Sequence, residues 1–128
     1  ANMIKFANLL GHESTGGRMF LEGLENMRKN LPLAEELGVT VLAGTDMAVP
    51  HGAVAQEAIR LKEYGLSDRA AARATSTSAY EHVGRHDAIR PGETADVVFF
   101  EENPYTDVAT LAHPKLIIHR GRIVGDHR

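Results

Sequence analysis

Apolar residues recur every three to four positions through much of the first two thirds of the chain, which is the spacing of an amphipathic helix. This pattern predicts helices over residues 18–30, 33–37, 53–64, 68–75 and 79–83. The first two are expected to be separate because Pro32 fits the first turn of a helix but not its interior. Gly38, Gly65 and Gly84 follow helical patterns and are expected to end them. The glycine-rich stretch 11–17 is typical of a loop.

A short apolar run without alternation follows Gly38. Its residues, Val39 to Ala43, are rich in β-branched side chains and predict a strand buried on both faces. A helix, a glycine and a buried strand in this order indicate a unit of a parallel α/β sheet. After Gly84 the pattern changes to short β-branched runs, which predict a strand at 97–100 and a hairpin at 116–124. One helical turn is expected in the loop between them, near residues 108–111.

Composition excludes several classes of protein. The 128 residues contain no cysteine, so there is no disulfide framework and no thiol nucleophile. A formal net charge of −3 with scattered basic residues argues against a nucleic-acid surface. No apolar run approaches the roughly 20 residues of a transmembrane helix, and no signal-peptide pattern is visible. We therefore expect a cytoplasmic protein that binds neither nucleic acid nor membrane.

Asp46 is the first candidate for chemistry because it follows the predicted strand 39–43. A carboxylate at the carboxyl end of a parallel strand faces the crevice where α/β proteins bind ligands. It could ligate a metal or move a proton there, or it could simply cap the following loop. His51 lies in the same loop and could bind substrate or metal, or be an exposed loop histidine.

Other chemical signals are weaker. His82 and His86 have the i, i+4 spacing of paired metal ligands, but Gly84 between them is expected to end the helix. The chain contains neither a His-x-His pair nor a Gly-x-Ser-x-Gly nucleophile motif. Arg69 and Arg73 are interpreted as solvated helix charges.

Three stretches in order, residues 37–46, 64–84 and 89–124, resemble the carboxyl-terminal portion of the amidohydrolase superfamily. The most similar branch contains imidazolonepropionase-like and prolidase-like metal-dependent hydrolases. This resemblance implies an α/β fold. Residues 1–88 would supply the last strand and helices of a (β/α)8 TIM-like barrel, and residues 89–128 would supply strands of a small flanking β-sandwich.

The resemblance also implies a reaction. In this family one or two divalent metals, usually zinc, activate a water that cleaves an amide, peptide or cyclic-amide C–N bond. Asp46 matches the aspartate of the last barrel strand, which would ligate metal and carry the proton from the water to the leaving nitrogen. His51 would line the pocket for a small-molecule or peptide substrate.

The chain departs from the family in length. A complete barrel needs roughly 250 residues, and the family's other metal ligands are not visible in these 128. The resemblance therefore predicts a fragment that is inactive alone and is paired with the remainder of its barrel or with itself. The alternatives are a non-catalytic scaffold or interaction subunit, and a small αβ binding domain in which Asp46 only caps a loop.

Overall fold

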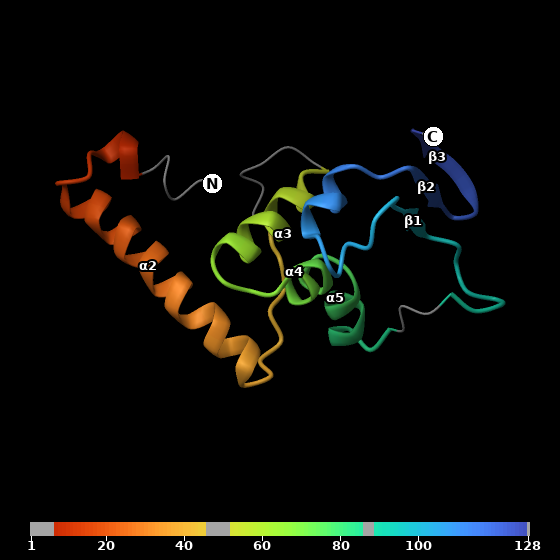
Figure 1. Ribbon diagram of the computed structural model, residues 1–128, viewed down its shortest axis with the longest axis horizontal. Coiled ribbons are helices and arrows are strands. Elements are labelled where there is room, and N and C mark those ends of the chain that lie inside the picture. The colour runs from red at the N-terminus through yellow and green to blue at the C-terminus, as the bar shows by residue number, and fades with distance from the viewer. Residues whose placement is uncertain (1–6, 46–51, 86–88, 128) are drawn as a thin grey trace.

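The computed structural model describes residues 7–45, 52–85 and 89–127. Residues 7–10 are helical and precede a long helix, α2 (Thr15–Glu36). The elements that follow are α3 (Val54–Glu63), α4 (Asp68–Ala74), α5 (Thr77–His82), β1 (Val97–Phe99), the 3-10 helix η1 (Val108–Ala112), β2 (Leu116–His119) and β3 (Arg122–Asp126). Figure 1 shows α2 on one side, α3, α4, α5 and η1 in the middle, and the sheet at the other end.

Glycine ends three of these helices, as the sequence predicts. Gly38, Gly65 and Gly84 have φ values of 70°, 111° and 72°, in the left-handed region that favours glycine. In each case the next amide donates back to the carbonyl five residues before it, which makes a Schellman motif. The donors and acceptors are Val39 to Ala34, Leu66 to Leu61, and Arg85 to Tyr80, at 2.8, 3.1 and 2.8 Å.

The expected break at Pro32 is wrong, because α2 continues through this residue to Glu36. A proline inside a helix removes one backbone hydrogen bond and is costly unless tertiary contacts compensate. Here the ring lies against Gly65. A Cβ atom at Gly65 would come within 2.5 Å of Pro32 Cγ, so the two helices approach through a residue without a side chain.

The start of α2 also differs from the expected loop over 11–17, since the helix already begins at Thr15. The Ser14 hydroxyl caps this end by accepting a hydrogen bond from the Gly17 amide at 2.9 Å. A Cβ atom at Gly17 would lie 2.0 Å from the Gly11 carbonyl oxygen. Glycine is therefore needed here for close approach of the backbone rather than for a turn.

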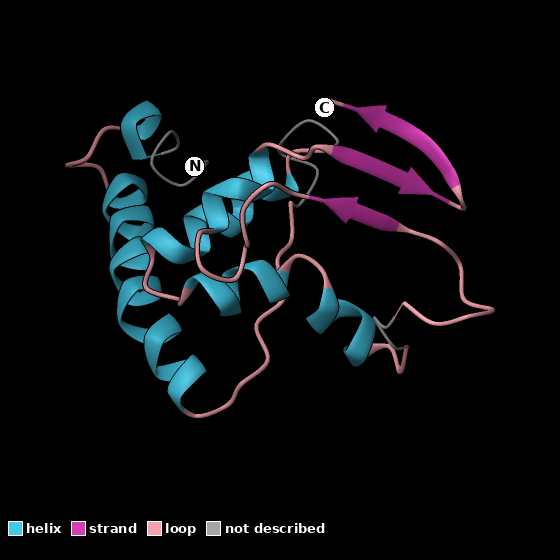
Figure 2. Cartoon of the chain, turned by 45° about the vertical axis from the view of Figure 1, so that its right-hand side comes forward, coloured by secondary structure: helices cyan, strands magenta, loops and turns pink. Residues whose placement is uncertain are grey.

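The three strands form an antiparallel sheet in the order β1-β2-β3. The predicted strand and hairpin are confirmed, and Figure 2 shows the sheet on one side of the molecule and the helices on the other. Arg120 and Gly121 turn the hairpin with φ values of 49° and 74°, as a type I′ turn requires. Asp96 accepts a hydrogen bond from the Arg120 amide at 2.7 Å and so fixes this turn to the start of β1.

The hydrophobic core lies among the helices. Its buried members are Ala58, Leu66, Ala71, Ala72 and Val108. Most are small, which lets α3 and α4 approach closely, and Val108 enters from η1 in the loop between β1 and β2. Residues 1–88 and 89–128 remain predicted as barrel and sandwich parts, and Val108 of the second part packs on helices of the first.

The predicted strand over Val39–Ala43 is wrong for this structure. Residues 39–45 are assigned to no strand, and the sheet that the structure describes is antiparallel rather than parallel. Burial on both faces is also wrong, because Val39 is 57% and Leu42 is 41% exposed. Strand formation depends on hydrogen bonds to neighbouring strands, which the local sequence cannot supply.

Candidate functional site

Asp46 and His51, the two predicted site residues, lie outside the described residues, so their roles stay predictions. The structure describes the residues on both sides of stretch 46–51, which contains them. Before it, segment 39–45 is held to the end of α4 by a hydrogen bond of 2.9 Å from the Ala43 amide to the Ala74 carbonyl. After it, Gly52 turns with φ +88° and leads into α3. Residues 46–51 therefore lie in the chain between this segment and the amino-terminal end of α3.

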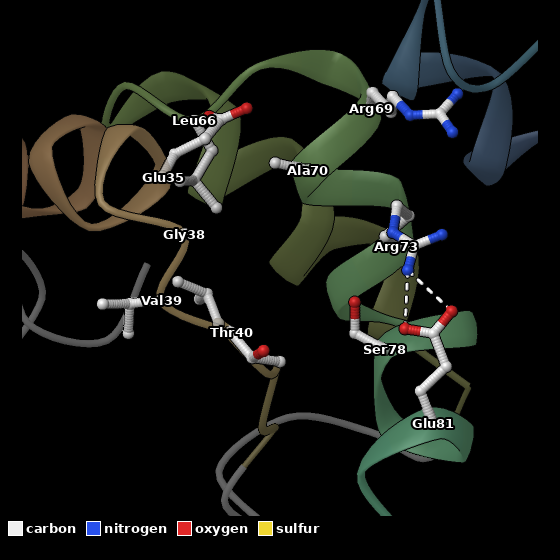
Figure 3. A pocket seen from close by; sticks show the side chains of 11 residues that line it. Glu35, Gly38, Val39, Thr40, Leu66, Arg69, Ala70, Arg73, Ser78 and Glu81 are labelled. Atoms are coloured by element: carbon white, nitrogen blue, oxygen red, sulfur yellow. Dashed lines mark hydrogen bonds and ion pairs between the residues drawn. The ribbon is translucent and has the colours of Figure 1, made fainter. Parts of the chain in front are cut away.

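A cleft of about 280 Å³ lies beside segment 39–45. One wall is formed by residues 38–41 and the other by α4 and α5, as Figure 3 shows. The charged side chains on its lining come from Glu35, Arg69, Arg73 and Glu81.

These charged groups are engaged within the chain. Arg73 donates to both carboxylate oxygens of Glu81, at 2.8 and 2.6 Å (Figure 3). The Arg69 guanidinium lies over the Tyr105 ring, 5.0 Å from its centroid. The interpretation of both arginines as solvated helix charges is therefore incomplete. An eight-residue separation between Arg73 and Glu81 matches no helical rule, so the sequence alone carried no signal for this pair.

Glu35 joins α2 to the start of α4. Its carboxylate accepts hydrogen bonds from the Ser67 amide at 2.8 Å and from the Ser67 hydroxyl at 2.5 Å. The same hydroxyl caps α4 by accepting from the Ala70 amide at 3.1 Å, as expected for a helix that begins after Ser67. These hydrogen bonds position the start of α4. They also occupy the Glu35 carboxylate with an amide and a hydroxyl donor.

Two aspartates have perturbed acidity for structural reasons. A hydrogen bond from Lys62, and then one from the Val108 amide at 2.9 Å, hold the pKa of Asp68 below its usual value. The Arg120 amide, and then His119 at 2.9 Å, lower the pKa of Asp96. Both carboxylates join elements of the fold, and His119 is 62% exposed at the surface.

Of the histidine pair with i, i+4 spacing, His82 and His86, only His82 lies in the described part of the chain. His82 is the last residue of α5, and Gly84 reverses the backbone just beyond it, as expected. His86 lies outside the described residues. Across ranges 7–45, 52–85 and 89–127, no three His, Asp or Glu side chains are close enough together to hold a metal ion. A catalytic zinc usually takes three protein ligands, so this part of the chain does not contain a complete site.

Comparison with known proteins finds relatives that are much longer than this chain. Proteins of uncharacterised function from Mycobacterium tuberculosis and Mycobacterium bovis are 34% identical over 94 residues, which are 72% of this chain and 25% of theirs. Ochratoxinase from Aspergillus niger is 34% identical over 91 residues, 67% of this chain and 19% of its own length. The chain thus spans a quarter or less of the curated relatives it matches.

No family model matches the chain. Among the helices that the structure describes, none combines the length and apolar character needed to cross a membrane. The similarity to ochratoxinase relates this chain to a hydrolase, at 34% identity and over part of each protein.

Proposed function

We propose that this chain is the carboxyl-terminal portion of a metal-dependent amidohydrolase that cleaves an amide, peptide or cyclic-amide C–N bond. The observation that carries the proposal is the similarity to ochratoxinase over 67% of the chain. The ordered resemblance of residues 37–46, 64–84 and 89–124 to one hydrolase superfamily points the same way. A small-molecule or peptide substrate is proposed on the same basis.

Asp46 is proposed to move the proton in this reaction. Its carboxylate would accept a proton from the attacking water while the water oxygen bonds to the carbonyl carbon. The same proton would then pass to the nitrogen as the C–N bond breaks, so the amine leaves neutral. His51, in the same loop, is proposed to contact the substrate. A bound divalent metal, with zinc the favoured ion, would acidify the water.

One carboxylate cannot hold that metal, and the described residues contain no three-ligand group. We therefore propose that the remaining ligands come from the part of the protein that lies outside these 128 residues. This requirement predicts that the isolated chain neither retains zinc nor hydrolyses amides. It also directs the experiment to the longest natural product of the gene that encodes this chain.

The test measures metal content and amine release together. The longest gene product is purified without chelator, weighed by native mass spectrometry, and assayed for amine release from a panel of N-acyl amino acids and cyclic amides. Asp46→Asn is expected to lower the rate at least 100-fold, as is typical for loss of a general base. Asp107→Asn is the matched control, because Asn can still cap η1, where Asp107 accepts from the Ala109 amide.

Two outcomes would contradict the proposal. In one, the longest gene product carries no metal and releases no amine from any member of the panel. In the other, Asp46→Asn hydrolyses as fast as the unmodified protein. Zinc retention or hydrolysis by the 128-residue chain alone, of 13.9 kDa, would instead refute the fragment interpretation.

A non-catalytic interaction subunit is the second candidate. It is favoured by the pairing of Glu35, Arg73 and Glu81 with groups of the chain itself, which suits a scaffold better than a reactive cleft. A metal-free complex in which this chain binds a partner, with no effect of Asp46→Asn on any activity, would favour this function.

A further inference from the structure

Helix α4 ends although the chain becomes helical again a few residues later. α4 stops at Ala74 and α5 begins at Thr77, so the two are separate helices in Figure 1. Between them, Ser76 leaves the helical conformation, with φ −144° and ψ −96°. A chain without this break would join α4 and α5 into one helix. The residues at the break therefore have to favour ending α4 over continuing it.

Two neighbouring hydroxyl groups, the hydroxyl pair of Thr75 and Ser76, favour this break. Each donates a side-chain hydrogen bond of 2.9 Å to the Ala72 carbonyl, and the Thr75 amide adds a longer bond of 3.3 Å. The last four carbonyls of an α-helix lack the amide partner that lies four residues ahead. For Ala72 that partner would be the Ser76 amide, which donates to Arg73 at 3.0 Å instead. The hydroxyl pair thus replaces the donor that a longer helix would supply.

The break makes the Ala74 carbonyl available to segment 39–45. In a continuous helix this carbonyl would accept from the Ser78 amide, whereas here it accepts from the Ala43 amide at 2.9 Å. Ala74 is 1% exposed and Ala43 is half-buried, so water competes poorly for this bond. A helix that ran through residue 76 would direct the carbonyl along its own axis. The end of α4 and the anchoring of Ala43 are therefore coupled.

We propose that Thr75 is a positioning residue for Asp46. The Thr75 hydroxyl helps to end α4, and the ended helix holds the Ala43 amide through the Ala74 carbonyl. Ala43 precedes Asp46 by three residues in the sequence. Catalytic rates are sensitive to misplacement by about 1 Å, so an anchor this close to a proton-transferring carboxylate affects the rate.

Thr75 is the principal member of the hydroxyl pair because it is half-buried, whereas Ser76 is exposed. A hydrogen bond shielded from water is stronger than one at the surface. The inference rests on the proposed function for the role of Asp46. The hydrogen bonds at the end of α4 are properties of this chain alone.

Hydrogen exchange in the longest natural product of the gene tests the anchor without any measurement of turnover. Thr75→Val removes the hydroxyl and nearly keeps the shape of the side chain. The Ala43 amide is expected to exchange about 10-fold faster in this variant, while the Ala58 amide of α3 changes by less than about 2-fold. An unchanged rate at Ala43 overturns the proposal. Equal acceleration at both amides also overturns it, because the hydroxyl would then stabilise the fold as a whole.

Two further variants separate the hydroxyl from the size of the side chain. Thr75→Ser keeps a hydroxyl and is expected to restore slow exchange at Ala43. Thr77→Val is the matched control, because the buried Thr77 hydroxyl has no hydrogen-bond partner among the described residues. It is expected to leave the exchange of Ala43 unchanged. Acceleration as large in Thr77→Val as in Thr75→Val would count against the role of Thr75.

Steady-state hydrolysis of the amide panel connects the anchor to Asp46. Thr75→Val is expected to lower kcat about 10-fold and to change KM by less than about 2-fold, and Thr75→Ser is expected to regain most of kcat. Full kcat in a Thr75→Val variant whose Ala43 amide exchanges faster overturns the positioning role and leaves the proposed function intact. An unmodified product that hydrolyses no member of the panel refutes the proposed function, and the role of Thr75 for Asp46 with it.

Discussion

The contact between Pro32 and Gly65 sets how closely α2 approaches the end of α3, and Gly65→Ala tests it directly. A Cβ atom at position 65 would lie 2.5 Å from Pro32 Cγ and 3.1 Å from Pro32 Cδ. The proline ring cannot rotate away, so α2 itself must shift. Gly65 also has φ +111°, a conformation that an alanine adopts only with strain.

The expected loss of stability has two parts. Left-handed backbone at an alanine costs about 1–2 kcal/mol, and overpacking of a close contact costs about 1–3 kcal/mol. Gly65→Ala should therefore lower the free energy of unfolding by about 2–5 kcal/mol. Gly38→Ala is the matched control, because Gly38 also ends a helix with φ +70° but has no atom within 4 Å of the added Cβ. It should show the backbone part alone.

Urea unfolding followed by circular dichroism measures the loss of stability in Gly65→Ala and in Gly38→Ala. A third measurement isolates the effect of the proline ring. In a Pro32→Ala background the steric part should disappear, so Gly65→Ala should then cost about as much as Gly38→Ala. The comparison is a double-mutant cycle, and a coupling between positions 32 and 65 of about 1 kcal/mol or more is expected. Equal losses for Gly65→Ala and Gly38→Ala in the unmodified chain would refute the proposed contact.

Three other substitutions test how the elements are joined. Ser67→Ala removes the hydroxyl that caps α4 and donates to Glu35, while the amide of residue 67 still donates to Glu35; the change should cost about 1–2 kcal/mol in urea unfolding, and a loss below the error of the measurement would contradict the cap. Val108→Ala empties a site that is 1% exposed and should cost about 1.5–3 kcal/mol, measured in the same way. Lys62 and the Val108 amide lower the pKa of Asp68. The ionised carboxylate therefore contributes fully to the free energy of unfolding above its unfolded pKa of 3.8, and this contribution is lost as the pH falls through the lower folded pKa. In a series of unfolding measurements across acidic pH, Asp68→Asn should reduce this acid-dependent loss, and an unchanged pH profile would argue against the two contacts.

The features that could be predicted from the sequence are those decided within a few residues. A glycine after a helical pattern ends the helix at Gly38, Gly65 and Gly84, because the left-handed residue lets the next amide reach back into the last turn. Arg120-Gly121 turns the hairpin for a similarly local reason. Ser67 caps α4 with its own hydroxyl.

The features that could not be predicted depend on residues far away in sequence. Pro32 remains inside α2 because Gly65 provides the space for its ring, and no local signal connects the two positions. Residues 39–43 have a strand-like composition, but a strand requires neighbours that the described chain does not supply. For the candidate site, the sequence predicts that Asp46 moves a proton and that His51 contacts the substrate. Both residues lie outside the described residues, so these roles remain predictions.

Val108 has a consequence for how such a chain can change during evolution. It is carried by the connection between two strands, yet its side chain completes the packing of α3 and α4. Replacing the sheet by an unrelated module would remove this side chain and leave a hole among the helices. The two parts are therefore not interchangeable units, and substitutions in the β1–β2 connection and in α3 and α4 should be selected together.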